Sequence, residues 1–157
     1  MLEKRQFYIS GQWVNSVDGR DYNVVNPSTE EPVAVISLGG QSDTDTAVAA
    51  AKVAFPAWMA TSLEDRLALV EKLVEVYETR MEDLAQAMSL EMGAPIDMAR
   101  TQQVNAGLGH LKNFIRAAKG LGFVAPLGDH APNDRIIHEP VGVCALITPW
   151  NWPMNQV

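Results

Sequence analysis

Residues 139–157 read EPVGVCALITPWNWPMNQV, and this stretch decides the fold expected for the chain. Its central part, residues 141–147, is an unbroken apolar run rich in β-branched residues and bounded by two prolines. Such a run without polar alternation predicts a strand buried on both faces, as in parallel sheets that helices cover. Ligands of open α/β sheets bind beyond the carboxyl ends of the strands, so we expect a site at the turn 148–153.

The same stretch resembles part of a known family. EPVGV followed by ITPWNWP matches, in order and spacing, the segment of NAD(P)-dependent aldehyde dehydrogenases that enters the nucleotide-binding domain. In that family the Asn of Pro-Trp-Asn supplies an amide to the oxyanion hole, which implies a catalytic role for Asn151. When a cysteine thiolate attacks an aldehyde, negative charge develops on the carbonyl oxygen. A preorganised donor at that oxygen lowers the barrier by roughly 3–4 kcal/mol.

The resemblance also implies roles for the neighbours of Asn151, with NAD or NADP as the cofactor. Trp152 resembles an aromatic residue of the substrate tunnel, a position that is often Phe or Tyr in the family, so the identity of the aldehyde stays open. From spacing alone, Asn151 would instead cap the next helix, with Pro153 in its first turn, and the two roles are compatible. The positions that resemble the cofactor cleft are Ile147, Thr148, Pro149, Trp150 and Asn151.

Composition limits the class of protein. The 157 residues are 47% hydrophobic and 20% charged, which suits a soluble globular domain with one core. A net charge of −7 with scattered Lys and Arg argues against a nucleic-acid partner. The sequence has no apolar run of about 18 residues and no apolar signal segment, so we expect no membrane association. A single cysteine fits a reducing compartment, which predicts a cytoplasmic protein.

Turn-forming residues predict two pairs of short strands near the N-terminus. Residues 7–14, FYISGQWV, indicate two strands joined at Ser10-Gly11. A second pair, residues 22–25 and 33–36, flanks the turn sequence NPST. VVNPSTEEPVAVI also resembles the N-terminal motif of the family, although turn signals of this kind are common elsewhere.

Helical spacing follows these strands and predicts four helices, of which the first two have clear start signals. Ser42 is the expected cap of the first helix, whose apolar residues recur on one face as far as Trp58. Thr61 and Glu64 are three residues apart and form a capping box for the second helix.

A Gly-Ala-Pro sequence separates the third helix from the fourth. The third is expected to carry Met81, Leu84, Ala85 and Met88 and to end near Gly93, where glycine is a standard stop. The fourth is expected over about residues 96–119. Its Gly107 and Gly109 would either let another element approach closely or weaken the helix.

Gly and Pro residues between positions 120 and 140 predict a boundary. Phe123-Val124 and residues 135–139 resemble the hairpin arm that the family uses for subunit contacts, which implies a homo-oligomer, a dimer or a tetramer. An ordinary β-meander is the alternative. We expect residues 1–119 to form the N-terminal part of a cofactor-binding domain, 120–140 the arm, and 141–157 the first strand and turn of the nucleotide-binding sheet.

Other reactive side chains are expected to be structural. Cys144 lies in the apolar run, and no cation or histidine near it in the sequence would lower the pKa of its thiol. It is therefore expected to be a buried small hydrophobe and not a nucleophile. His110, His130 and His138 are too far apart in the sequence to suggest a metal site.

The chain resembles only the N-terminal part of the family's proteins. The family's nucleophile lies in a Gly-Gln-x-Cys motif and its general base in Glu-Leu-Gly-Gly, and this sequence contains neither. Because covalent catalysis needs nucleophile, base and oxyanion donors together, the chain alone is expected to be inactive. The intact protein is expected to oxidise an aldehyde to a carboxylic acid with NAD(P) through a cysteine thiohemiacetal.

The expected fold class is α/β. It is the N-terminal portion of an aldehyde dehydrogenase-like, Rossmann-type cofactor-binding domain, with short N-terminal β-hairpins, four helices and a protruding β-arm. Two alternatives stay open. An acylating or phosphate-reducing relative would share this architecture and differ in its downstream catalytic residues. A non-catalytic α/β module would instead use its exposed arm and strand edge to bind a partner, and a stable monomer of this length would favour it.

Overall fold

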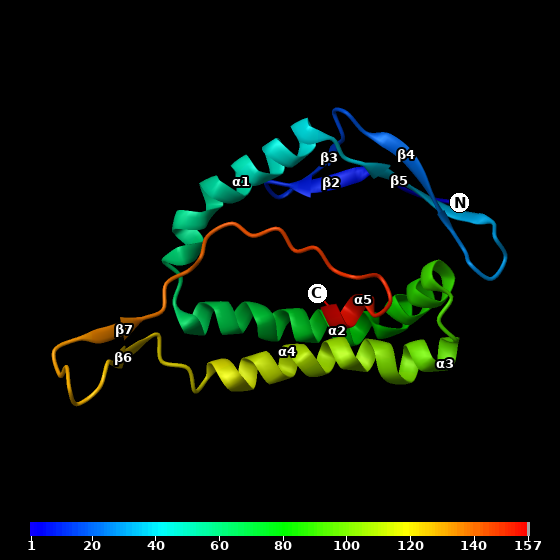
Figure 1. Ribbon diagram of the computed structural model, residues 1–157. Coiled ribbons are helices and arrows are strands. Elements are labelled where there is room, and N and C mark those ends of the chain that lie inside the picture. Colours follow the sequence, from blue (N-terminus) through cyan, green and yellow to red (C-terminus); the bar gives the residue numbers. More distant parts are fainter. Residues whose placement is uncertain (157) are drawn as a thin grey trace.

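A computed structural model describes residues 1–156 of the chain. Figure 1 shows the N-terminal strands and α1 (Gln41–Met59) on one side of the molecule, and α2 (Leu63–Met92) and α4 (Val104–Ala118) packed side by side on the other. The C-terminal segment returns across the space between these two parts. None of the described helices is long and apolar enough to cross a membrane.

The first predicted hairpin is confirmed. Strand β2 (Gln6–Ile9) pairs antiparallel with β3 (Gln12–Asn15). The two turn residues have positive φ angles, 52° at Ser10 and 76° at Gly11, as a tight primed turn requires. The Tyr8 and Trp13 rings lie opposite each other on the paired strands, with centroids 5.2 Å apart.

The second predicted pair is also confirmed, as part of a three-stranded sheet. Strands β4 (Arg20–Val25) and β5 (Pro32–Leu38) are antiparallel, and β1 (Leu2–Lys4) adds to the other edge of β5 in parallel. In the turn between β4 and β5, the Asn26 side chain accepts the backbone N–H of Ser28 at 2.8 Å, which is the Asx chemistry expected of NPST. Strand β1 was not predicted, because its three residues, Leu-Glu-Lys, are too few to show the alternation of apolar and polar residues that indicates a strand.

Helix α1 is capped by an aspartate rather than by Ser42. The residue before the helix is Gly40, and the Asp43 carboxylate accepts its backbone N–H at 3.0 Å. The same carboxylate accepts the Ser16 hydroxyl and, at 2.9 Å, the N–H of Val17. Asp43 is 7% exposed, so one buried carboxylate joins the helix start to the loop after β3. Ser42 itself is exposed.

The two helices expected between residues 62 and 92 are one helix of 30 residues, α2. No Gly or Pro lies between residues 63 and 92, so the sequence contains no signal that would end one helix and begin another within this range. Ser62, one residue later than expected, is the cap and accepts the N–H of Asp65 at 3.0 Å. Gly93 ends the helix in the left-handed conformation, with φ 77°, as predicted.

The fourth predicted helix forms with an irregularity near its start. A short turn, α3 (Ile96–Met98), leads into a π-helical segment, η1 (Ala99–Gln103), and then into α4. Residues of η1 and α4 pack on α2 and complete the buried core, which consists of Ala85, Met88, Ala94, Ala99 and Val104. Across this core the Tyr77 hydroxyl donates to the carbonyl of Val104 at 2.8 Å.

The arm is a hairpin that projects past the ends of α2 and α4 (Figure 1). Its strands β6 (Val124–Pro126) and β7 (Arg135–Ile137) are antiparallel, as predicted. At its base the Arg66 guanidinium of α2 lies 5.5 Å from the centroid of the Phe123 ring. Cation–π contacts of this kind contribute about 0.5–1 kcal/mol at exposed sites.

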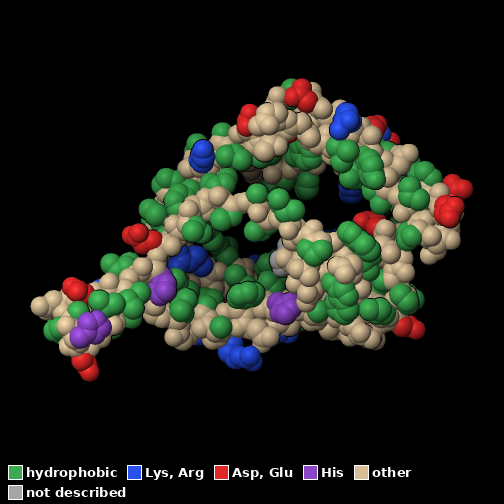
Figure 2. Space-filling view, in the orientation of Figure 1, with side chains coloured by type: hydrophobic (Ala, Val, Ile, Leu, Met, Phe, Trp, Pro, Cys, Tyr) green, Lys and Arg blue, Asp and Glu red, His purple; other side chains and the backbone are tan. Residues whose placement is uncertain are grey.

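The predicted strand over residues 141–147 is wrong for this structure. The segment is extended but belongs to none of the sheets among residues 1–156, and Val141 and Ile147 are 96% and 93% exposed. Cys144, expected to be buried, is exposed as well. A strand requires hydrogen-bonded neighbours, and here none of the described strands lies against this segment. Figure 2 shows it crossing a hollow between the two parts of the molecule.

We predict that Asp43→Asn lowers the thermal stability of the protein and that the loss depends on pH. The hydrogen bond from Ser16, with those from Val17 and Gly40, holds the pKa of Asp43 below its usual 3.8. A carboxyl with a lowered folded-state pKa stabilises the fold above its unfolded-state pKa, and this stabilisation disappears as pH falls through the folded-state pKa.

The midpoint of thermal unfolding, measured at pH 7 and near pH 3, tests this expectation. The difference between the protein and Asp43→Asn should be largest at pH 7 and should shrink at the lower pH. Asp45→Asn is the matched control, because Asp45 is exposed and, within residues 1–156, its side chain accepts one bond, from Gln41 of its own helix. Equal midpoints for the two variants at pH 7 would contradict the role assigned to Asp43.

Candidate functional site

The candidate site is the turn before α5 (Pro153–Gln156), the short C-terminal helix. Asn151 lies in a bend on this turn and is exposed. Among residues 1–156 its side chain forms no hydrogen bond, so the alternative in which Asn151 caps the helix is wrong. The first turn is instead closed by the backbone, because the N–H of Asn155 donates to the carbonyl of Trp152 at 3.0 Å. The amide of Asn151 is therefore free to meet a ligand.

The other predicted site residues lie next to Asn151 but differ in exposure. Ile147 is 93% and Trp150 is 79% exposed, and Thr148 and Pro149 are exposed as well. Trp152 is partly buried. The structure thus brings the predicted residues together only as consecutive positions of one extended segment. Their surfaces are accessible, which suits one wall of a binding cleft.

A groove of about 590 Å³ separates part of this segment from α2. Its lining is mainly apolar, and Glu91 supplies the one carboxylate. Asn151 does not line it. The lining residues are Val24, Leu84, Ala87, Met88, Glu91, Met92, Thr148, Pro149, Trp150, Pro153 and Met154.

Helix α5 is fixed on α4 at a glycine. A Cβ atom built on Gly107 would lie 2.5 Å from the Met154 carbonyl oxygen and 2.7 Å from the Tyr77 hydroxyl. Gly107 is buried, and only a glycine leaves room for this approach. One turn further along α4, His110 Nε2 lies 2.7 Å from Asn155 Oδ1. Met154 also packs against the core cluster.

The two glycines of α4 differ in their surroundings. Gly107 lets another element approach closely, as one of the two alternatives proposed. A Cβ atom added at Gly109 would meet nothing within 4 Å, so no close approach requires a glycine at this position. The bond between His110 and Asn155 was not predicted. The spacing of three places Gly107 and His110 on one face of α4, but no feature of the sequence indicates that Asn155 lies against that face.

An ion pair fastens the irregular part of the fourth helix to α2. Arg100, in the π-helical segment, donates to both carboxylate oxygens of Glu82 at 2.6–3.2 Å. These bonds, with one from Gln86, lower the pKa of Glu82 to about 2. Both side chains are exposed to solvent, so the pair orients the segment more than it stabilises the fold.

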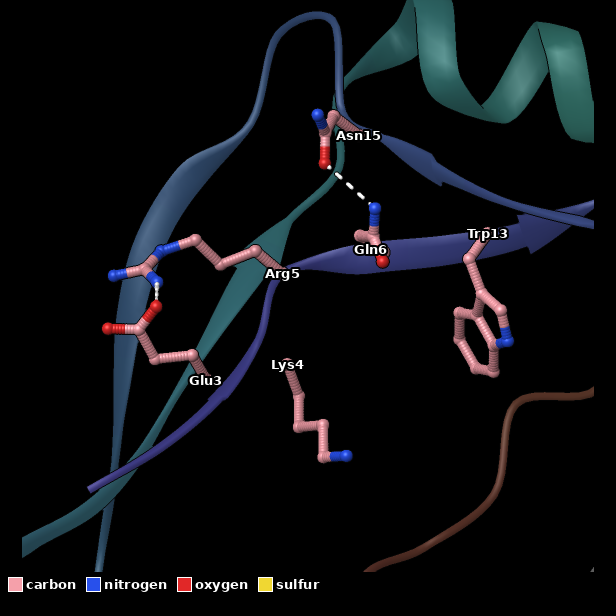
Figure 3. A pocket seen from close by; sticks show the side chains of 6 residues that line it. All are labelled: Glu3, Lys4, Arg5, Gln6, Trp13 and Asn15. Atoms are coloured by element: carbon pink, nitrogen blue, oxygen red, sulfur yellow. Dashed lines mark hydrogen bonds and ion pairs between the residues drawn. The ribbon is translucent and has the colours of Figure 1, made fainter.

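A second cavity, of about 660 Å³, lies at the N-terminal strands and contains none of the predicted site residues. Figure 3 shows Arg5 directed toward Glu3, the Gln6 and Asn15 amides bonded to each other, and Trp13 on the neighbouring strand. Arg5 also bonds to Asp21, which lowers the pKa of that carboxyl. The Arg5 guanidinium is thus already paired, and we assign no chemistry to this cavity.

Within residues 1–156 no three His, Cys, Asp or Glu side chains gather as a metal site would need. The three histidines are spread over α4, the loop of the arm and the residue after β7.

Comparison with known proteins identifies the family. Residues 13–157 match the model of the aldehyde dehydrogenase family. The chain belongs to this family. A crystal structure of an aldehyde dehydrogenase from Bartonella henselae is 49% identical and superposes with a TM-score of 0.97 over 99% of the chain. The α/β fold is thus the N-terminal portion of an aldehyde dehydrogenase, as predicted.

One further relative is named for its substrate, and another was crystallised with ligands. The 3-succinoylsemialdehyde-pyridine dehydrogenase of a Pseudomonas species is 43% identical over the whole chain. A variant of aldehyde dehydrogenase C from Pseudomonas syringae, crystallised with NAD+ and octanal, is 43% identical with a TM-score of 0.91 over 97% of the chain. The chain spans about a third of the length of these relatives: 32% of the first, 30% of the second and 33% of the Bartonella protein.

We predict that Tyr77→Phe reduces the free energy of unfolding by about 1 kcal/mol, the usual net value of one buried hydrogen bond. The reason is the bond from the buried Tyr77 hydroxyl to the Val104 carbonyl, which joins α2 to α4. Denaturant titration measures the change. Tyr22→Phe serves as the control, because Tyr22 is 55% exposed. A loss for Tyr77→Phe no larger than that for the control would contradict this contribution.

Proposed function

We propose that the full-length protein oxidises an aldehyde to a carboxylic acid with NAD or NADP, through a thiohemiacetal on a cysteine outside this chain. Membership of the aldehyde dehydrogenase family supports the reaction class. The observation that carries the proposal for this chain is the free, exposed amide of Asn151 on a turn that α4 and α5 hold in place.

In this proposal the Asn151 side chain acts as an oxyanion donor. Attack of a thiolate on the aldehyde carbon moves an electron pair to the carbonyl oxygen. The Asn151 amide N–H donates to that oxygen and needs no proton transfer of its own, whereas a carboxylate at this position would repel the charge. A donor that is fixed before the reaction costs no reorganisation, which is why such groups are effective. We propose that Trp152, partly buried beside Asn151, contacts the substrate.

The exposed residues before Asn151 fit one wall of a cofactor cleft. Ile147 and Trp150 present open apolar surface, and Thr148 and Pro149 continue the same extended segment. We propose that these four residues and Asn151 line the side of the cleft that this chain supplies. Bound NAD(P) would supply the hydride acceptor at this wall. Hydride loss from the thiohemiacetal would leave a thioester, and water attacking its carbonyl carbon would release the carboxylic acid and free the thiolate.

The nucleophile is not Cys144. Its thiol is exposed, and its one described hydrogen bond runs to the backbone carbonyl of Gly142 at 3.7 Å. An activated nucleophile needs an adjacent base or cation.

We also propose how the chain is divided in the full-length protein. Residues 1–119 form the N-terminal part of the cofactor-binding domain and residues 120–140 form the arm. Residues 141–147 become the first strand of the nucleotide-binding sheet when neighbouring strands pair with them.

We predict that Asn151→Ala in the full-length protein lowers kcat by about 10²–10³-fold, the usual cost of removing one oxyanion donor. KM for the aldehyde should change little, because the bond strengthens in the transition state. Steady-state kinetics with an aliphatic aldehyde and NAD+ provide the measurement. Gln156→Ala, an exposed position three residues after Pro153, is the control. An unchanged kcat in Asn151→Ala would reject the assignment.

We also propose that the arm contacts a second subunit, so that the full-length protein is a dimer or a tetramer. The support is the exposed apolar surface on both strands: Val124 is 60%, Ile136 42% and Ile137 62% exposed. Single exposed apolar residues are common, but a hairpin that projects with several of them favours an interface.

We predict that Ile137→Asp shifts the full-length protein to a smaller assembly, since a buried charge without a partner weakens an interface. Sedimentation velocity measures the mass of each variant. Val53→Asp is the control: Val53 is 83% exposed on α1 and is not part of the arm. If Ile137→Asp keeps the same mass as the unmodified protein, the arm does not hold the subunits together.

A further inference from the structure

The turn that carries Asn151 leads directly into α5, and the packing of this helix fixes the turn from its C-terminal side. Before it, residues 139–150 lie in no strand and are mostly exposed. After it, α5 packs on α4 and η1, and Met154 reaches the core cluster. Because this packing fixes the turn, the position of the turn depends on the surface that α4 offers to α5.

We propose that Gly107 and His110 are positioning residues for Asn151. This inference rests on the proposed function, in which Asn151 donates to the developing oxyanion. Gly107 sets the distance between α4 and α5, because its missing side chain leaves the space that the Met154 carbonyl occupies. His110 sets the rotation of α5 through its bond to Asn155. Neither residue touches the reacting atoms.

The contact at Gly107 leaves no room for adjustment. An added Cβ atom would meet the Met154 carbonyl oxygen at 2.5 Å, the Tyr77 hydroxyl at 2.7 Å and the Met154 Cβ at 3.0 Å. Two of these three atoms belong to α5 and the third is fixed by its bond to Val104. Tyr77 is buried in the core. The element that can move is α5, so any side chain at position 107 displaces the turn.

The bond at His110 has a defined direction. An amide oxygen only accepts hydrogen bonds, so the Nε2–H form of the imidazole donates to Asn155 Oδ1 at 2.7 Å. Asn155 lies four residues after Asn151 and donates its backbone N–H to Trp152. The path from α4 to Asn151 thus runs through one side-chain bond and one backbone bond.

The chemistry of the oxyanion explains why this support matters. A donor is effective when it lies about 2.7–3.1 Å from the position of the oxyanion. A displacement of about 1 Å caused by a distant substitution costs up to 10²-fold in rate. A shift of α5 is therefore expected to lower kcat while leaving the residues that bind the aldehyde and the cofactor in place.

The first comparison is between two glycines of the same helix, in the full-length protein. We expect Gly107→Ala to lower kcat by about 10–100-fold with little change in KM. Gly109→Ala is the matched control and should keep the unmodified kcat, because its added Cβ atom meets nothing within 4 Å. Equal kcat values for the two folded variants would overturn the role of Gly107.

The second comparison tests whether His110 acts through Asn151, and it does not depend on the folding of Gly107→Ala. We expect His110→Ala and Asn155→Ala to lower kcat by a similar factor of about ten. The double variant should be no slower than either alone. His110→Gln should restore most of the rate, since its amide N–H can donate from nearly the same position as Nε2. Full activity in His110→Ala, or no recovery in His110→Gln, would overturn the proposal.

A third measurement separates this inference from the proposed function. In an Asn151→Ala background, His110→Ala should cause no further loss of kcat, because the donor that it positions is absent. A full additional tenfold loss would show that His110 acts by another route and would overturn the inference. If Asn151→Ala alone leaves kcat unchanged, the proposed function fails, and the role of His110 fails with it. If Asn151→Ala is slow and His110→Ala is not, only the positioning role fails.

Discussion

The position of the C-terminal turn depends on one close contact, where the Met154 carbonyl of α5 lies against the bare backbone of Gly107 in α4. The Tyr77 hydroxyl occupies the same space from α2 and is tied to the carbonyl of Val104. Protein interiors are packed too closely to absorb an extra methyl group at such a point. One glycine therefore determines how near the C-terminal turn lies to the helical core.

This contact explains how the chain presents an ordered turn beside an unpaired segment. The apolar run before the turn has no strand to pair with among the described residues and is largely exposed, with Leu146 82% accessible. The turn takes its position instead from the helices behind it, which are joined by the buried core and by the Arg100–Glu82 pair. A catalytic amide at Asn151 would thus be oriented by residues remote from the cofactor.

The sequence predicted those parts of the fold that depend on local chemistry. The Ser10-Gly11 turn and the stop at Gly93 were expected from residues that allow few other conformations, whereas the hairpin arm was expected from the resemblance to the family. The strand at residues 141–147 was not formed, because an apolar pattern specifies a strand only where another strand supplies hydrogen bonds. The site was predicted from its motif at Asn151. The bond between His110 and Asn155 was not, since it joins residues 45 positions apart whose proximity only the packing of α5 reveals.

Packing of α5 on α4 is proposed to hold the Asn151 amide at the reacting carbonyl. A crystal structure of the full-length protein with an aldehyde bound would show whether it does. We expect the Asn151 amide nitrogen to lie about 3 Å from the aldehyde oxygen while the Met154 carbonyl still rests against Gly107. An Asn151 side chain turned away from that oxygen, or an α5 separated from α4 in the active complex, would contradict it.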